Sequence, residues 1–236
     1  MAKPKTNLVV KSNYLVEASY KLSLNAQRLT LFAISKLRSR APMKGQKVQR
    51  IEALEFAKMF GINPKNAYST LKTACDDLYE ADIKTYDHKG MDRFRWCERV
   101  RFENAGYIDL YFTDSIAPYL TKIYGEFTKY ELSSLSDVKS VYSIRLFELL
   151  KKHKYKHDKN SGERWITIED FKKWFEVGDK YPRYYDLKRR VIMPAIKELE
   201  EKANLTISWE EIREKRQVVK LEFMYEENSQ LMLDFK

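Results

Sequence analysis

The chain has 236 residues, of which 44 are Lys or Arg and 34 are Asp or Glu, so its formal net charge at pH 7 is +10. An excess of this size favours a polyanionic partner such as nucleic acid. No stretch approaches the roughly 20 apolar residues of a membrane span, and residues 1–11 carry charge and Pro4 where a signal peptide would be apolar. The two cysteines, Cys75 and Cys97, form no CxxC pair, so we expect a reduced, cytoplasmic protein.

The first part of the chain reads as helices followed by strands. Apolar residues three and four positions apart predict a helical segment over residues 12–37. Residues 36–50 hold six basic side chains and no acidic one, which predicts a basic loop that either contacts phosphate or is a solvated connector. Two helices are expected at 52–60 and 64–81, the second capped by Asn63. Strands are then expected at residues 83–87, 93–102 and 107–112.

The second part repeats this order after a Ser-rich junction. An amphipathic helix is expected at 138–155, and a basic run follows at 151–159. A short strand at 165–168 leads into Thr167 and Asp170, whose spacing is typical of a capping box. The remaining elements are expected to be a helix at 182–202 and strands at 205–212 and 217–225.

These two parts contain an internal repeat. Residues 56–62 read Phe-Ala-Lys-Met-Phe-Gly-Ile and residues 171–177 read Phe-Lys-Lys-Trp-Phe-Glu-Val, and a proline, Pro64 or Pro182, then opens a second helix. A helix, a turn, a second helix and a strand hairpin make a winged helix-turn-helix. We therefore predict an α+β fold of tandem winged helix-turn-helix domains, mostly helical with small antiparallel β wings. The expected parts are domain 1–130, domain 131–229 and a tail at 230–236.

The outward faces of the two second helices differ. Projection at about 100° per residue turns Tyr184, Leu187, Val191, Ala195 and Leu199 inward in the second copy. Arginines on the opposite face can donate two hydrogen bonds to guanine edges in the major groove. The residues expected to read bases are Arg183, Asp186, Arg189, Arg190 and Met193.

Further basic residues and one tyrosine are candidates for contact with DNA phosphates. In the second domain these are Lys180, Tyr181, Lys188, Lys197, Arg213, Lys215 and Arg216, and in the first domain they are Arg93, Arg95, Arg99 and Arg101. The second helix of the first copy instead turns Asp76, Asp77 and Glu80 outward, and these carboxylates would repel phosphate. We expect the first domain to contact the DNA backbone through its basic loop and wing arginines, or to form a protein interface; alternatively, those arginines only decorate an exposed strand.

Pro194 lies inside the second helix of the second copy. Proline removes one helical hydrogen bond there, so a bend is expected. The bend either fits the helix to the DNA groove or is a tolerated packing feature.

The residues that catalysis would need are lacking. A strand-nicking initiator uses paired metal-binding histidines and a tyrosine nucleophile, whereas this chain has only His88, His153 and His157. The last two stand in a lysine run that would repel a cation. A phosphate-binding loop of the form GxxxxGK[ST] is also missing from the sequence. We expect a protein that is not an enzyme and that uses no metal and no cofactor.

Several segments resemble the iteron-binding plasmid replication initiators, and the resemblance covers nearly the whole chain. Residues 186–191, Asp-Leu-Lys-Arg-Arg-Val, and 193–199, Met-Pro-Ala-Ile-Lys-Glu-Leu, carry it most clearly. Residues 8–13 and 23–29 are similar to the opening of that family, and residues 142–150 to the first helix of its second domain. The resemblance implies two winged-helix domains.

The resemblance also implies partners. In such initiators the second domain reads directly repeated sites at a replication origin, and the first contacts the DNA backbone or mediates dimerisation. Monomers, in equilibrium with a homodimer, bind the repeats and help to open an adjacent AT-rich segment, and the host replicative helicase and initiator are recruited. Dimers bind an operator inverted repeat and repress the protein's own gene.

The final residues, 230–236, read Gln-Leu-Met-Leu-Asp-Phe-Lys. They are similar to the Gln-Leu-x-Leu-x-Phe peptide by which bacterial replication proteins dock on the sliding clamp. Leu231, Leu233 and Phe235 would enter an apolar pocket, while Gln230 would make a polar contact. The alternative is a terminal strand that packs on the second wing.

A winged-helix transcriptional repressor without origin function remains the alternative to an initiator. The chemistry of the DNA contacts would be the same in both, so the sequence does not separate them. The clamp-like tail and the unequal domains favour the initiator.

Overall fold

The computed structural model describes residues 7–152 and 161–228. The chain forms two compact units, Met1–Asp137 and Val138–Lys236. This division falls later than the expected boundary near Glu131. The reason is that the strand ending at Glu131 pairs with the first strand of the chain, and the next residues bury Leu132 and Leu135 in the same unit.

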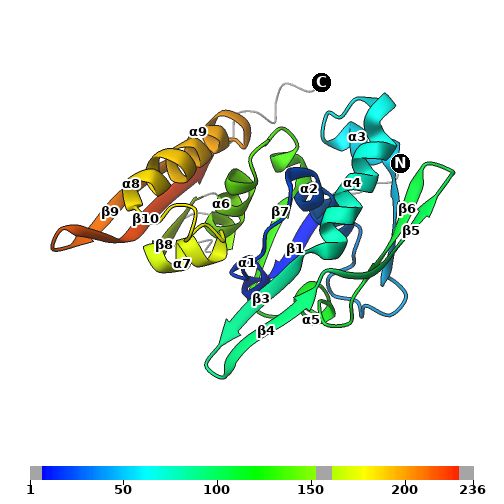
Figure 1. Ribbon diagram of the computed structural model, residues 1–236, viewed down its shortest axis with the longest axis horizontal. Coiled ribbons are helices and arrows are strands. Elements are labelled where there is room, and N and C mark those ends of the chain that lie inside the picture. Colours follow the sequence, from blue (N-terminus) through cyan, green and yellow to red (C-terminus); the bar gives the residue numbers. More distant parts are fainter. Residues whose placement is uncertain (1–6, 153–160, 229–236) are drawn as a thin grey trace. The chain divides into compact units, whose positions relative to one another are not determined.

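Unit 1 combines helices with short antiparallel sheets (Figure 1). Their order is β1 (Leu8–Ser12), α1 (Asn13–Val16), α2 (Leu24–Ser35), β2 (Val48–Glu52), α3 (Ala53–Met59), η1 (Pro64–Asn66), α4 (Ala67–Glu80), β3 (Asp82–Asp87), β4 (Gly90–Arg95), β5 (Cys97–Glu103), β6 (Tyr107–Phe112), α5 (Ala117–Leu120), β7 (Phe127–Glu131) and η2 (Leu132–Leu135). The strands make three antiparallel sheets, β1-β7, β3-β4 and β2-β6-β5.

The helix-turn-helix of unit 1 forms where the sequence predicts it. The Asn63 side chain accepts a hydrogen bond from the backbone N–H of Lys65 at 3.0 Å and so caps η1. In α4, Leu71, Ala74 and Leu78 are buried. They lie three or four residues apart, so one face of α4 packs on the core while the other meets solvent.

Two expectations for unit 1 are wrong in detail. Residues 12–37 are not one helical segment, because β1, α1 and an extended stretch precede α2; within that stretch Ser19 forms a β-bridge with Lys84, and Ser23 caps α2. The expected strand 93–102 is two strands that part at Trp96, whose fully buried ring meets Tyr20 edge-on at 5.0 Å. A large buried side chain at this position takes the chain from one sheet to the other.

Unit 2 has the same pattern with a longer wing (Figure 1). Its elements are α6 (Val141–Lys152), β8 (Ser161–Thr167), α7 (Ile168–Trp174), α8 (Tyr184–Leu187), the π-helical turn η3 (Lys188–Ile192), α9 (Met193–Lys202), β9 (Leu205–Glu214) and β10 (Gln217–Glu227). The sheet has the antiparallel order β8-β10-β9.

Unit 2 is held together by apolar packing and by two polar links. Phe171 and Phe175 stack with ring centroids 4.0 Å apart. The Thr167 cap is confirmed, since the Asp170 N–H donates to the Thr167 hydroxyl at 3.0 Å; the Asp170 carboxylate accepts from that hydroxyl at 2.8 Å, in place of the backbone N–H contact of a full capping box. From α9, Glu198 accepts backbone hydrogen bonds at the start of α6; although burial raises its pKa, these and other hydrogen bonds lower it below the ordinary value.

Each unit is thus a winged helix-turn-helix domain, as predicted. The strands are more extensive than small wings require, because each hairpin continues into a sheet that supports the helices. Among the described residues, no helix has the length and apolar composition of a membrane-spanning segment.

Candidate nucleic-acid interface

The second helix of unit 2 continues from α8 through η3 into α9. Leu187, Val191, Ala195 and Leu199 are buried, as the helical projection predicts, and Tyr184 is half-buried. These side chains fix which face of the helix is turned to solvent.

The helix contains a π turn directly before Pro194. Pro194 has no N–H, so it cannot bond to the carbonyl of Arg190 four residues earlier. A π turn uses bonds to the fifth residue and adds one residue to the turn, which accommodates a missing bond within a continuous helix. It also brings Ile192 into the buried face next to Val191.

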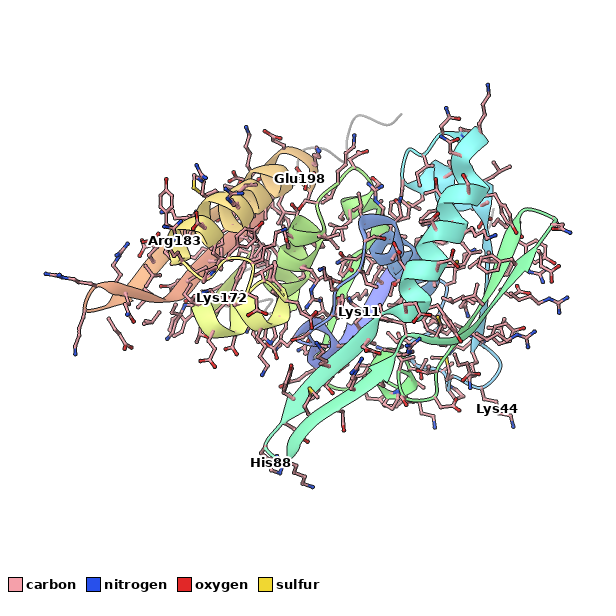
Figure 2. All side chains as sticks on the ribbon, in the orientation of Figure 1. Lys11, Lys44, His88, Lys172, Arg183 and Glu198 are labelled. Carbon is pink, nitrogen blue, oxygen red and sulfur yellow. The ribbon has the colours of Figure 1, made fainter. Side chains whose placement is uncertain are left out.

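The first cation of this surface is held in place by an acid. Arg183, labelled in Figure 2, is 79% exposed at the start of α8, and its guanidinium contacts the Asp186 carboxylate at 2.8 Å. Asp186 itself is only 18% exposed. The Asp186 carboxylate therefore orients the Arg183 side chain, and it faces that guanidinium rather than open solvent.

Arg189, Arg190 and Met193 lie on the solvent side of the same helix. All three are exposed. The Arg189 guanidinium lies 5.8 Å from the centre of the Tyr185 ring. Within residues 7–152 and 161–228, neither Arg189 nor Arg190 has a carboxylate within ion-pair distance, so both charges are available to an external anion.

Glu211 on β9 joins the helix to the wing. Its carboxylate accepts hydrogen bonds from Lys188 at 2.8 Å, from the Tyr184 hydroxyl at 2.9 Å and from Arg213 at 2.5 Å. Partial burial raises the pKa of Glu211, but these three donors outweigh it and lower the pKa to about 2. Burial, and then Glu211, raise the pKa of Tyr184 above its ordinary value.

This arrangement changes what two of the predicted phosphate ligands do. Lys188 and Arg213 share Glu211, and the Lys188 ammonium also lies 5.1 Å from the Trp209 ring centre. Lys188 therefore links the helix to the wing, while Arg213, on the same strand as Glu211, holds that carboxylate within the wing. Lys215 and Arg216 are exposed at the tip of the β9–β10 hairpin, where Lys215 has a positive φ of 55°.

The predicted contact of Tyr181 with phosphate does not fit its position in the structure. It is 8% exposed and packs in the core of unit 2, so its ring does not project toward a phosphate backbone. Lys180 beside it is exposed, and its ammonium lies 5.3 Å from the Tyr181 ring centre. The hydrogen bond with the Tyr181 side chain raises the pKa of Lys180. Lys197 is exposed on α9, with Glu201 at 3.8 Å.

In unit 1, three of the four predicted wing arginines have carboxylate partners. Arg93 donates to Asp82, Arg95 contacts Glu80 and Asp82, and Arg101 contacts Glu103. Arg99 instead lies over the Tyr111 ring, 4.8 Å from its centre. Much of the positive charge of this wing is therefore balanced within the unit.

The basic loop is also partly balanced. Ion pairs join Lys36 to Glu55, Lys47 to Asp114 and Arg50 to Asp109 at 2.8–3.0 Å. The remaining basic residues, Arg38, Arg40 and Lys44 (Lys44 is labelled in Figure 2), are exposed and have no ion pair within the described part of the chain.

The buried Gln46 organises the same loop. Its side-chain amide exchanges hydrogen bonds with the backbone of Arg38 and donates to the carbonyl of Pro42. The loop is therefore folded rather than a loose connector. A glutamine within a basic run carries no recognisable signal in the sequence, and the same holds for Glu211, which accepts hydrogen bonds from Tyr184 and Lys188 on a helix more than twenty residues earlier.

Negatively charged side chains are concentrated on α4. Asp76, Asp77 and Glu80 are exposed there, as the sequence predicts. The solvent-facing side of the second helix therefore carries carboxylates in unit 1 and arginines in unit 2.

Metal ligands do not come together in residues 7–152 and 161–228, where no group of three or more His, Cys, Asp or Glu side chains could hold an ion. Cys75 and Cys97 are both buried and free; burial raises the pKa of Cys97 to about 12. The tail residues Gln230, Leu231, Leu233 and Phe235, and the pair His153 and His157, lie outside the described residues.

Two family models match the chain over the two units. The model "Initiator Replication protein, WH1" matches residues 8–151, and the model "Initiator Rep protein, WH2" matches residues 167–225. The chain belongs to this family of initiator replication proteins. The two winged-helix domains of the family correspond to units 1 and 2.

Two Escherichia coli relatives in the initiator family are similar along most of the chain. A "Replication initiation protein" is 24% identical over 204 residues, which cover 85% of this chain and 64% of the relative. The "PI protein" is 25% identical over 249 residues, covering 90% of this chain and 80% of the relative. The chain thus spans less than two thirds of the length of the first relative.

A solved structure shares the fold. The crystal structure of the Pi initiator protein in complex with iteron DNA matches with a TM-score of 0.80 and 23% identity, over 96% of this chain and 100% of that chain. This match supports the pair of winged-helix domains described above.

Proposed function

We propose that this initiator protein starts plasmid replication by binding directly repeated double-stranded DNA at the origin, the iterons, through unit 2. The observation that carries the proposal is the exposed pair Arg189 and Arg190 on the second helix of unit 2, both free of carboxylate partners within the described residues. The second helix of a helix-turn-helix enters the major groove, where arginine is the commonest reader of guanine. The fold shared with a protein bound to iteron DNA supports this assignment.

The other residues of the surface have distinct roles in the proposal. Asp186 orients Arg183 for a base contact at the start of the helix, and Met193 gives an apolar contact to a thymine methyl group. Lys180, Lys197, Lys215 and Arg216 contact phosphates, which sets register without reading sequence. Lys188 acts through Glu211, since that link holds the wing beside the helix, and Arg213 positions Glu211 from the same strand.

Unit 1 contacts the DNA backbone and mediates dimerisation in this proposal. The exposed cations Arg38, Arg40 and Lys44 of the basic loop suit phosphate better than the wing residues Arg93, Arg95 and Arg101, because those three already have carboxylate partners. Arg99 has no such partner among the described residues.

The wider role in initiation is also part of the proposal. The monomer helps to open the origin and recruits the host replicative helicase and initiator, while the dimer binds an operator inverted repeat and represses its own gene. The tail at 230–236 docks on the sliding clamp through Gln230, Leu231, Leu233 and Phe235. A pull-down with purified clamp, using intact protein and protein that lacks residues 230–236, tests this docking, and equal recovery would remove it.

A transcriptional repressor without origin function is the second candidate, because the same helix would read an operator. The test has two arms. The purified protein is footprinted on the DNA around its own gene, and that DNA is placed on a plasmid that cannot replicate without it. Protected direct repeats and replication that requires the protein support the initiator; a single protected operator and no replication would establish the repressor instead.

A further inference from the structure

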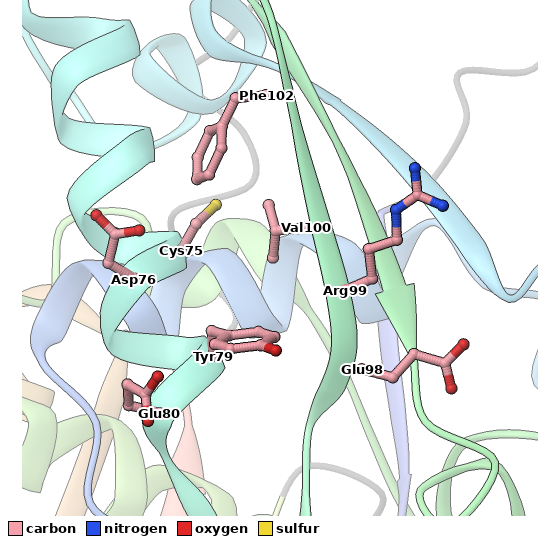
Figure 3. Close-up of a pocket in the computed structure, with 8 residues that line it drawn as sticks. All are labelled: Cys75, Asp76, Tyr79, Glu80, Glu98, Arg99, Val100 and Phe102. Atoms are coloured by element: carbon pink, nitrogen blue, oxygen red, sulfur yellow. The ribbon is translucent and has the colours of Figure 1, made fainter.

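An open pocket lies between α4 and β5 in unit 1, whereas the helix surface proposed to read DNA belongs to unit 2. Its volume is about 300 Å³. Figure 3 shows the Cys75 and Tyr79 side chains pointing from α4 toward Val100 and Phe102 on β5. Phe102 and Tyr79 are large side chains left 38% and 40% exposed. The floor of the pocket is therefore apolar and partly open to solvent.

One wall of this pocket is an unpaired strand edge. In the sheet β2-β6-β5, strand β5 pairs with β6 on one side only. No other strand of the described chain pairs with its opposite edge, so part of the backbone N–H and C=O groups between Cys97 and Glu103 lack a strand partner there. An edge of this kind accepts an extended peptide as an additional strand.

The other wall is acidic. Asp76 and Glu80 line the pocket from α4, and Figure 3 shows both carboxylates at the helix side of it. Glu80 contacts Arg95 at 3.3 Å, whereas Asp76 has no cationic partner within the described residues. Lys72 and Arg95 lie over the Phe102 and Tyr79 rings of the same pocket, at 5.6 and 5.7 Å from the ring centres, so Asp76 is the carboxylate through which this wall attracts a basic segment.

A second copy of the chain fits this edge poorly. Antiparallel pairing of two β5 strands about Val100 would place Arg99 of one copy directly opposite Arg101 of the other. Like charges in directly opposite positions destabilise a strand pair. DNA is also unsuited to a wall of carboxylates.

We propose that the pocket between α4 and β5 binds an extended, basic segment of a partner protein, which adds a strand to β5. Alternate apolar side chains of the segment enter the pocket over Val100 and Phe102, and a Lys or Arg pairs with Asp76. The site is separate from the base-reading surface, so a bound partner would be carried to DNA by unit 2.

The test uses the full chain and a labelled seven-residue peptide, acetyl-Lys-Val-Arg-Val-Lys-Val-Arg-amide, with binding followed by fluorescence anisotropy. Asp76→Lys should weaken binding by about tenfold or more, which is about 1.4 kcal/mol. The matched control is Asp77→Lys, which makes the same charge change on the neighbouring exposed residue but does not line the pocket. We expect that control to change affinity by about threefold or less, since it acts only through the screened long-range field.

Two further arms test the strand addition. The same peptide with an N-methyl group on every backbone nitrogen has no N–H to donate to β5 from either edge, so it should bind about tenfold more weakly or worse. Hydrogen exchange should slow at amides of residues 98–102 when the unmodified peptide is bound. Equal loss of affinity in the two aspartate variants, or equal binding of the methylated peptide, would overturn the proposal. A dimer lost in Asp76→Lys without any peptide binding would assign the pocket to a second copy instead.

Discussion

Glu211→Gln tests the link between the reading helix and the wing of unit 2. The glutamine has nearly the same size as the glutamate and can still accept a hydrogen bond, but it carries no charge. In the native chain, the Glu211 carboxylate accepts bonds from Lys188, Tyr184 and Arg213, and it is 16% exposed. The substitution therefore removes the charge from three interactions and leaves the packing in place.

The expected magnitude comes from the lowered pKa. A carboxyl whose pKa is about 2 in the folded protein, against roughly 4.3 in an unfolded chain, contributes at most about 3 kcal/mol of stability at neutral pH. Lys188 and Arg213 are partly exposed and regain water when the charge is lost. We therefore expect Glu211→Gln to lower the free energy of unfolding by about 2 kcal/mol at pH 7.

The lowered pKa of Glu211 also fixes the direction in which stability changes with pH. Because the folded pKa is depressed, the contribution is complete above the unfolded pKa and is lost as pH falls through about 5 toward 2. The stability difference between native protein and Glu211→Gln should shrink across that window. Urea unfolding followed by tryptophan fluorescence measures it, since Trp209 lies beside Lys188.

The control for this experiment is Glu210→Gln, the adjacent exposed position on β9. It makes the same chemical change on the opposite face of the strand. A loss in Glu211→Gln that equals the loss in Glu210→Gln, or that does not vary between pH 5 and pH 2, would refute the reasoning.

Three further perturbations follow from the same unit. Asp186→Asn should release the Arg183 guanidinium and weaken binding to repeat DNA by about fivefold to tenfold, with little change in the free energy of unfolding. Binding titrations on repeat and scrambled DNA measure this effect, and an equal loss of affinity on both DNAs would contradict the prediction. Thr167→Ala removes the cap of α7 and should cost about 1 kcal/mol in thermal or urea unfolding, so an unchanged midpoint would argue against a stabilising Thr167 cap. Pro194→Ala supplies the missing N–H, so we expect a regular helix and a protein that is no less stable. The variant should bind repeat DNA more weakly, because the π turn that places Arg190 is lost. If the new amide is protected from hydrogen exchange but the DNA affinity is unchanged, the π turn serves packing alone.

The parts of the fold that were predicted correctly depend on local signals. The inward residues of α4 follow from a helical period, and the caps at Asn63 and Thr167 follow from side chains that bond within three residues. The exposure of Arg189 and Arg190 follows from the same period. Each of these features depends only on residues within one turn or one helix, so the local sequence is enough to predict it.

The parts that were missed depend on distant partners. No strand was predicted at β1, and it forms because β7, more than a hundred residues later, pairs with it. The role of Lys188 depends on Glu211, and that of Arg93 depends on Asp82 across a hairpin. Whether a cation is free or balanced is a property of such pairs, which neither charge counts nor periodicity reveals.

The central claim is that unit 2 reads bases through Arg189 and Arg190. The most direct measurement compares binding of native protein, Arg189→Ala and Arg190→Ala to repeat DNA and to scrambled DNA at two salt concentrations. We expect each substitution to cost about 1 to 3 kcal/mol on the repeat and far less on scrambled DNA, whereas Lys197→Ala weakens both alike and lowers the salt dependence. Equal losses on the two DNAs for both arginine variants would contradict the account.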